Sequence, residues 1–346
     1  MTKRSLGRAG AAALSLALAT AMVPSALAQE TGYRLYVSNE YSADISVIDP
    51  ATDEVIETIP ISERPGEVRP RGLGVSPDGS VVYISVSDFN TQLQSPEDQI
   101  IGIDVRTNDI VTAFHAGGNP ERLAVSTDGT EIWASLEATA QVGGYHVDTG
   151  VQFAGLRVGV EAEGVAVSPD GQWVYVTAEA THSVSVIDRV NRMVVKHLLV
   201  GNRPRVVQFS PDGTRAYVSA EIGGTISVID TSTHTVINTI NLGLDARPVE
   251  IAVDPDGSRL FVAGGGTSAI YVIDTATDAV TNVIREQVGR RPWGVAISPD
   301  GERVYTANGL SDSITVIDTN CLCVVDSIAG GRGPHSVVVG LVPDAQ

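Results

Sequence analysis

The chain has 346 residues and a formal net charge of −18 at pH 7, from 41 acidic and 23 basic side chains. A protein with this charge is repelled by nucleic acids and anionic membranes, so neither is expected as a partner of its whole surface. The 35 glycines and 17 prolines indicate frequent turns and argue against a mainly helical fold.

The first 28 residues have the pattern of a secretory signal peptide. Lys3, Arg4 and Arg8 precede an apolar run at 11–23, and Ala26-Leu27-Ala28 matches a small-x-small cleavage site. The apolar run is shorter than the roughly 20 residues that a membrane span needs. We therefore predict cleavage near Ala28, a periplasmic or secreted protein, and no membrane span in the mature chain.

A repeat follows this segment, marked by a turn tetrapeptide that recurs every 42–50 residues. The tetrapeptide occurs as SPDG at 76–79, 168–171, 210–213 and 298–301, as STDG at 126–129, as DPDG at 254–257, and as VPDA at 342–345. Pro-Asp-Gly favours a tight turn with positive φ at the glycine. Four short apolar, β-branched runs lie between successive turns and predict four strands per repeat.

The phase of the repeat predicts how the strands are assembled. The sequence YRLYVSN at 33–39 matches the second strand of the repeat, and SVVVGLV at 336–342 matches the first. The C-terminal strand is therefore expected to pair with the N-terminal three, which removes two unpaired strand edges. We predict an all-β fold over 29–346, a seven-bladed β-propeller of four-stranded antiparallel blades.

The segments that precede the first strand of each blade are predicted to be loops around one mouth of the central channel. They read VRPRG (68–72), NPERL (119–123), AEGV (162–165), RPRVV (203–207), RPVEI (247–251), RPWGV (291–295) and GPHSV (333–337). In and beside them are nine arginines, namely Arg69, Arg71, Arg122, Arg203, Arg205, Arg247, Arg290, Arg291 and Arg332. Glu121, Glu163, Glu250, Trp293 and His335 lie among them.

Two interpretations of this mouth are open. Guanidinium groups bind carboxylate and phosphate, so the mouth is a candidate site for an anionic ligand or an acidic partner. Alternatively, each arginine pairs with a neighbouring carboxylate and the arrangement is structural. Trp293 is either a stacking platform or a plug of the channel. His335 is a weak candidate for a general base, because no nucleophile or metal partner is visible beside it.

Three further features fall outside the repeat pattern. Long segments at 61–70 and 87–99 are expected on the same face as the mouth, as a lid or as neutral decoration. Cys321 and Cys323 form a C-x-C pair on the opposite face, either a local disulfide or an incidental pair. The six histidines are scattered, and no zinc or haem motif is present, so no metal site is predicted.

The repeats resemble the YVTN-type β-propeller family over residues 33–343. A closer likeness is to the PQQ-dependent catabolism-associated β-propeller proteins. It rests on YVSNEYSADISVID (36–49), NPERLAVSTDG (119–129), RPRVVQFSPDGTRAYVSAEIGGTISVID (203–230), and ANG (307–309) followed by DSITVID. Members of that group are exported and are encoded beside transport genes and quinoprotein dehydrogenases. The group has no established catalytic residues, so the resemblance assigns none here.

The resemblance implies an exported, non-catalytic propeller that is accessory to quinoprotein alcohol catabolism. It would bind an anionic small molecule, with PQQ as a candidate cofactor, or dock on a quinoprotein dehydrogenase or a transporter component. The alternative is an enzyme, either a propeller lactonase-type hydrolase or the large subunit of a quinoprotein amine dehydrogenase. A hydrolase would require His335 together with a carboxylate and a metal or arginine clamp.

Overall fold

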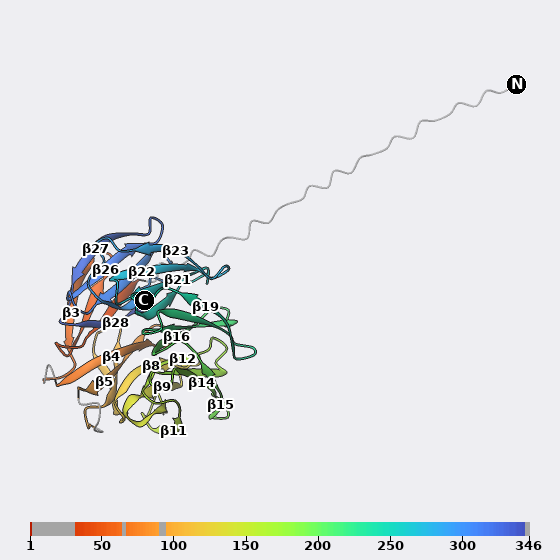
Figure 1. The fold of residues 1–346 in the computed structure, drawn as a ribbon. Helices are drawn as coiled ribbons and strands as arrows, with labels where there is room; N and C mark the ends of the chain where they lie inside the picture. The colour runs from red at the N-terminus through yellow and green to blue at the C-terminus, as the bar shows by residue number, and fades with distance from the viewer. Residues whose placement is uncertain (2–31, 64–66, 90–94, 343–346) are drawn as a thin grey trace. The chain divides into compact units, whose positions relative to one another are not determined.

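The computed structural model describes residue 1 and residues 32–63, 67–89 and 95–342. These residues form seven four-stranded antiparallel sheets and one short 3-10 helix, η1 (Glu137–Thr139). Figure 1 shows the strands as arrows, coloured along the chain. The predicted seven-bladed propeller is confirmed. The predicted signal peptide, apart from Met1, and the end of the VPDA copy lie outside the described residues.

The seven sheets are the blades, and we number them I to VII in chain order with their strands given from the channel outwards. Blade I contains β28 (Pro334–Leu341), β1 (Tyr33–Asn39), β2 (Asp44–Asp49) and β3 (Glu54–Pro60). Blade II contains β4 (Val68–Val75), β5 (Val81–Asp88), β6 (Gln99–Asp104) and β7 (Ile110–His115). Blade III contains β8 (Pro120–Val125), β9 (Glu131–Leu136), β10 (Gln141–His146) and β11 (Gln152–Arg157).

The other four blades repeat this order. Blade IV contains β12 (Ala162–Val167), β13 (Trp173–Ala178), β14 (Ser183–Asp188) and β15 (Met193–Leu199). Blade V contains β16 (Pro204–Phe209), β17 (Arg215–Ala220), β18 (Thr225–Asp230) and β19 (Thr235–Asn241). Blade VI contains β20 (Pro248–Val253), β21 (Arg259–Gly264), β22 (Ala269–Asp274) and β23 (Ala279–Ile284). Blade VII contains β24 (Pro292–Ile297), β25 (Arg303–Asn308), β26 (Ser313–Asp318) and β27 (Cys323–Ala329).

Blade I closes the ring in the predicted way. β28 pairs antiparallel with β1, with Tyr33 opposite Leu341 and Val37 opposite Val337. The innermost strands of neighbouring blades contact one another all the way round, including β28 with β4 and β24 with β28. Residues from the two ends of the sequence therefore share one sheet, and the inner edge of β1 is paired.

The hydrophobic core lies between the blades. The second and third strands of each blade are almost fully buried, whereas the outermost strands, such as β19, are mostly exposed. Each apolar cluster takes residues from adjacent blades: Tyr217 and Val228 of blade V pack in the same cluster as Leu260 and Ile273 of blade VI. A blade buries its faces only against its neighbours, so the stability of each blade depends on the ring.

The turn tetrapeptide builds a tight link between the first two strands. In the copy at 76–79, the Ser76 hydroxyl donates a hydrogen bond to Asp78 Oδ1 (2.6 Å) and accepts one from the Val81 amide (2.9 Å). Gly79 has a φ of +74°, which an L side chain rarely adopts. The side-chain hydrogen bonds keep the pKa of Asp78 below its ordinary value, so this carboxylate stays charged.

The segments predicted as mouth loops are instead the beginnings of the innermost strands. Each of these strands shifts register near its start: in β16, Pro204 is opposite Ala220 but Val207 is opposite Val218. Similar shifts occur in the six equivalent pairs. A β-bulge accommodates a proline that a regular strand would not. The mouth residues therefore belong to the innermost strands, at their bulges, and not to loops.

Candidate functional site at the channel mouth

Each bulge places one residue at the same position around the channel. In blades I to VII these residues are His335, Arg71, Glu121, Glu163, Arg205, Val249 and Trp293. We call these seven residues the mouth ring. Six of them are buried, and Trp293 is half-buried.

The arginines of blade II are paired with carboxylates. Arg71 contacts Glu40 (2.8 Å) and Glu121, and Arg69 contacts the same two residues at 3.2 and 3.1 Å. Burial alone would lower the pKa of Arg71, but Glu121, Glu40 and Glu163 raise it above its ordinary value. The side chain remains charged, and its partners offset much of the cost of removing that charge from water.

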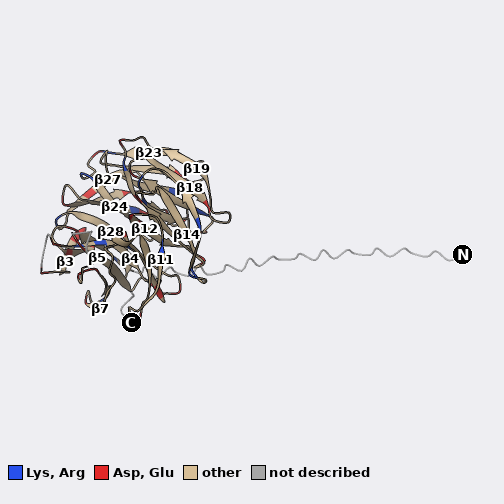
Figure 2. Ribbon diagram, turned by 60° about the horizontal axis from the view of Figure 1, so that its bottom comes forward, with Lys and Arg blue, Asp and Glu red and all other residues tan. Residues whose placement is uncertain are grey.

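The arginines of blade V form a second paired group. Arg205 lies 3.1 Å from Glu163 and also contacts Glu179. Arg203 contacts Glu179 at 2.7 Å and Glu221 at 3.6 Å. For these two groups of arginines, the structural interpretation of the mouth agrees with the observed contacts. Acidic and basic segments are accordingly interspersed over the ribbon (Figure 2).

An ion pair between Arg122 of blade III and Glu250 of blade VI crosses the channel just beneath the mouth ring. Burial raises the pKa of Glu250, although Arg122 acts to lower it. Beyond this pair the channel contains two cavities of about 290 and 240 Å³, which are lined mainly by apolar residues of the innermost strands. The ion pair therefore separates a charged mouth from an apolar channel.

His335 opens on the mouth in a pocket of about 140 Å³. The pocket is also lined by Glu40, Arg71, Arg291 and Trp293, among others. His335 is 3% exposed, and neither ring nitrogen has a hydrogen-bond partner among the described residues. Burial lowers the pKa of His335 well below 6.5, and the nearby arginines, Arg71 first, add to this effect. The imidazole is therefore neutral at pH 7, with one nitrogen able to accept a proton.

Trp293 forms an aromatic wall of the same pocket. The guanidinium of Arg291 lies 4.4 Å from its ring centroid, that of Arg205 lies 4.9 Å away, and the His335 ring is 5.5 Å away. These contacts are typical of a stacking residue and hold the indole in place. Arg291 itself lies 3.9 Å from Glu221, its only acidic contact among the described residues.

The sequence analysis missed a row of acidic residues that completes this network. A glutamate directly follows the second strand in blades I, III, IV and V: Glu40, Glu137, Glu179 and Glu221. Blades VI and VII have Gly265 and Gly309 at that position. Burial, with the charge of Glu121, raises the pKa of Glu137 to about 8. Comparing the residue after each YVS-like strand would have revealed the row.

Three predicted arginines lie outside the paired groups. Arg247 and Arg290 are exposed and line a second pocket of about 340 Å³ together with Arg291. Arg332 is exposed in the segment before β28. Thus the arginines predicted to ring the mouth do not form one site: those of blades II, III and V contact carboxylates closely, whereas Arg247 and Arg290 have no carboxylate partner among the described residues.

The two long segments are only partly described, because 64–66 and 90–94 lie outside the described residues. Phe89 is half-buried: its ring stacks on Tyr41 at 6.2 Å between centroids and lies 5.3 Å from the guanidinium of Arg69. It therefore attaches the start of its segment to the paired arginines of blade II. Whether the segment serves as a lid stays a prediction.

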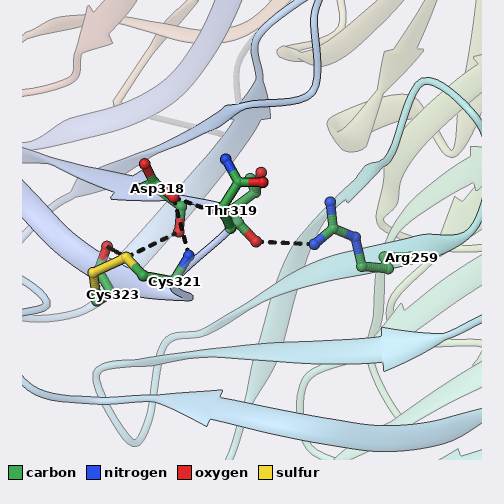
Figure 3. Close-up of a disulfide and its surroundings, with 6 residues drawn as sticks. Arg259, Asp318, Thr319, Cys321 and Cys323 are labelled. Atoms are coloured by element: carbon green, nitrogen blue, oxygen red, sulfur yellow. Dashed lines mark hydrogen bonds between the residues drawn. A yellow bond between two sulfur atoms is a disulfide. The ribbon is translucent and has the colours of Figure 1, made fainter.

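Cys321 lies in the turn between β26 and β27, and Cys323 is the first residue of β27, on the face opposite the mouth. Cys321 and Cys323 form a disulfide with Cα atoms 5.2 Å apart (Figure 3). The Cys321 amide donates to Asp318 Oδ1 (3.1 Å), and Arg259 donates to the Thr319 carbonyl (3.1 Å).

Within the described residues no three His, Cys, Asp or Glu side chains are placed to hold a metal ion. No helix described there has the length and apolar character of a membrane span.

Comparisons with known proteins agree with this architecture. The family model "Lactonase, 7-bladed beta-propeller" matches residues 190–322. The chain is a β-propeller protein. No curated protein matches the propeller significantly.

Solved structures with a similar fold come from several bacteria. A functionally unknown protein from Desulfotomaculum acetoxidans has a TM-score of 0.76 at 16% identity, covering 90% of the propeller chain and 100% of its own. A proposed 6-phosphogluconolactonase from Bacteroides fragilis has a TM-score of 0.69 at 18% identity, and the match covers 89% of the propeller chain and 98% of its own. Hydrazine synthase from Kuenenia stuttgartiensis has a TM-score of 0.52 at 20% identity, and the match covers 72% of the propeller chain and 95% of its own. At such identities the likeness shows the fold alone.

Proposed function

We propose that the propeller hydrolyses a small lactone in the His335 pocket. The observation that carries this proposal is a buried, neutral imidazole whose nitrogens have no partner among the described residues, in a pocket with two arginines. A neutral imidazole nitrogen with a free lone pair can take a proton from the attacking water, and positive charge nearby can stabilise the oxyanion that forms at an ester carbonyl. The partial match to the lactonase model supports this reaction over the non-catalytic function predicted from the resemblance.

Three residues of the pocket, His335, Arg291 and Trp293, act in the proposed reaction. His335 removes a proton from a water molecule as its oxygen attacks the lactone carbonyl carbon. Arg291 stabilises the negative charge that develops on the carbonyl oxygen, and Trp293 packs against the ring of the substrate. The ring C–O bond then breaks, and the leaving oxygen takes the proton from His335. The product is a hydroxy acid, and the imidazole is neutral again.

In the first test, the purified protein is given a panel of five- and six-membered sugar lactones. The rate of hydrolysis is measured as the amount of base needed to hold the pH constant. His335→Gln should lower kcat/KM by about 100-fold or more, because a positioned general base contributes roughly 10²–10⁴. His115→Gln is the matched control, since His115 is exposed on outer strand β7. The proposal fails if wild-type protein is no faster than buffer, or if both variants retain full activity.

The pH dependence gives a second test. His335 must be neutral to act as a base, and its pKa is well below 6.5. Activity should therefore stay constant from pH 7 down through 6.5 and decline only at lower pH, as the imidazole gains a proton. The measurement is kcat/KM between pH 5 and 7, where spontaneous lactone hydrolysis is slow, with circular dichroism to monitor folding. A half-maximal point at or above pH 6.5 would contradict the role of His335.

A second candidate function is the non-catalytic one. The pairing of Arg71 and Arg205 with carboxylates favours it, because an arginine that already contacts carboxylates stabilises the oxyanion of a hydrolysis reaction less strongly. The propeller would then dock on an exported quinoprotein dehydrogenase or transporter component, or carry an anionic ligand, PQQ among the candidates, at the arginines outside the paired groups. Native mass spectrometry of protein purified from its own host distinguishes the two: a retained small ligand, together with no lactone hydrolysis, supports the carrier.

A further inference from the structure

We infer that the pocket between blades VI and VII, which shares Arg291 with the His335 pocket, is a binding site for a small oxyanion with two negative charges, such as a phosphate or dicarboxylate group. The pocket measures about 340 Å³ and is lined by Arg247, Gly265, Gly266, Ser268, Arg290, Arg291 and Leu310. The inference does not depend on lactone hydrolysis, because binding is measured without turnover.

The first argument is the local absence of acidic partners. Among the described residues, neither Arg247 nor Arg290 has a carboxylate oxygen within 4 Å, whereas Arg69 and Arg71 of blade II and Arg203 of blade V each contact one at 3.2 Å or less. The difference follows from the row of acidic residues after the second strands. That row holds glutamate in blades I, III, IV and V but glycine in blades VI and VII.

The second argument is the shape of the pocket floor. A Cβ atom at Gly266 would lie 2.2 Å from the Asp245 carbonyl oxygen and 3.0 Å from Arg247 Cγ, so no side chain fits there. At Gly265 the nearest atoms to such a Cβ, including the Pro292 carbonyl oxygen, lie at 3.4 Å or more. Gly265 therefore has room for a side chain but carries none, whereas blade V has the carboxylate of Glu221 at the equivalent position.

The third argument is the set of donors that faces one ligand. Arg247 and Arg290 offer planar guanidinium groups that match the geometry of an oxyanion. The Ser268 hydroxyl accepts a hydrogen bond from the Arg291 amide (3.2 Å), and its own proton is free to be donated. The protein has a formal net charge of −18, so an anion is repelled by most of the surface and attracted to the arginines of this pocket.

The experiment measures binding of inorganic phosphate and of malonate by titration calorimetry at constant ionic strength. Binding of either probe is expected, and the preferred probe identifies the oxyanion. The double variant Arg247→Gln/Arg290→Gln should weaken binding by about 100-fold, because each charge-assisted hydrogen bond contributes roughly ten-fold or more. Both residues are exposed, so the variant is expected to fold, which a melting curve checks.

The matched control is Arg106→Gln/Arg157→Gln, which removes the same charge from exposed positions in the turn after β6 and on β11. It should bind both probes like the wild type. If neither probe binds the wild type, or if the two double variants bind equally well, the site is wrong. A loss of binding in the Arg247/Arg290 variant alone supports it, whether or not the protein hydrolyses lactones.

Discussion

Arg205 shows how single residues determine the character of the mouth. Its side chain is 4% exposed, and Glu163, Glu179 and Glu221 around it are exposed to a similarly small extent. A buried guanidinium needs such partners, because the desolvation of an unpaired ion costs several kcal/mol. The same pairing reduces the attraction of Arg205 for an outside anion. An arginine's contribution to binding here therefore depends on its neighbouring glutamates.

This reasoning predicts the effect of Glu179→Gln. Glu179 contacts both Arg203 and Arg205, so the variant leaves the buried Arg205 with Glu163 as its main partner. The free energy of unfolding should fall by about 3 kcal/mol, the range observed when a buried ion pair loses one partner. Urea denaturation followed by circular dichroism measures it. The exposed Glu302→Gln is the control, and a loss of less than about 1 kcal/mol would contradict the prediction.

At the residue scale, sequence analysis found half of the network. Arg71, Arg205, Trp293 and His335 were predicted at the mouth because all stand before a first strand in the repeat. Glu121 and Glu163 were predicted there too, but the partners Glu40 and Glu179 were missed because they stand in a different connection of the repeat, after the second strand. Two connections that are separated in sequence meet at one face only after the blades fold, and only a repeat-by-repeat alignment of both could have paired them.

At the scale of elements, the informative feature is the bulge in each innermost strand. The turn tetrapeptides and β-branched runs predicted the strands and their order, because both signals are local. The mouth segments were predicted as loops because they connect the fourth strand of one blade to the first strand of the next. In the structure Pro204 begins β16, and the register shift that follows accommodates Arg205 and Val206. A proline is tolerated at the first residue of a strand or at a bulge, so the innermost strands begin earlier than the sequence pattern indicated.

At the scale of the whole molecule, closure of the ring by β28 supports every blade. Deletion of 334–346 removes β28, exposes the inner edge of β1, and takes Val337 from the core shared by blades I and VII. The truncated protein should lose its cooperative melting transition, which circular dichroism measures. Deletion of 343–346 alone is the control and should leave the transition in place. A melting curve like that of the wild type after the longer deletion would refute closure.

The position of His335 on β28 links the proposed chemistry to the order of protein synthesis. During translation, β1, β2 and β3 emerge first and wait for their fourth strand until almost all of the chain has been made. During this interval the edge of β1 is open to pairing with other chains. A polypeptide interrupted before residue 335 lacks the imidazole of the mouth, so incomplete copies have no activity in this pocket. Activity or ligand binding at this pocket would then report directly on the fraction of full-length, closed propellers.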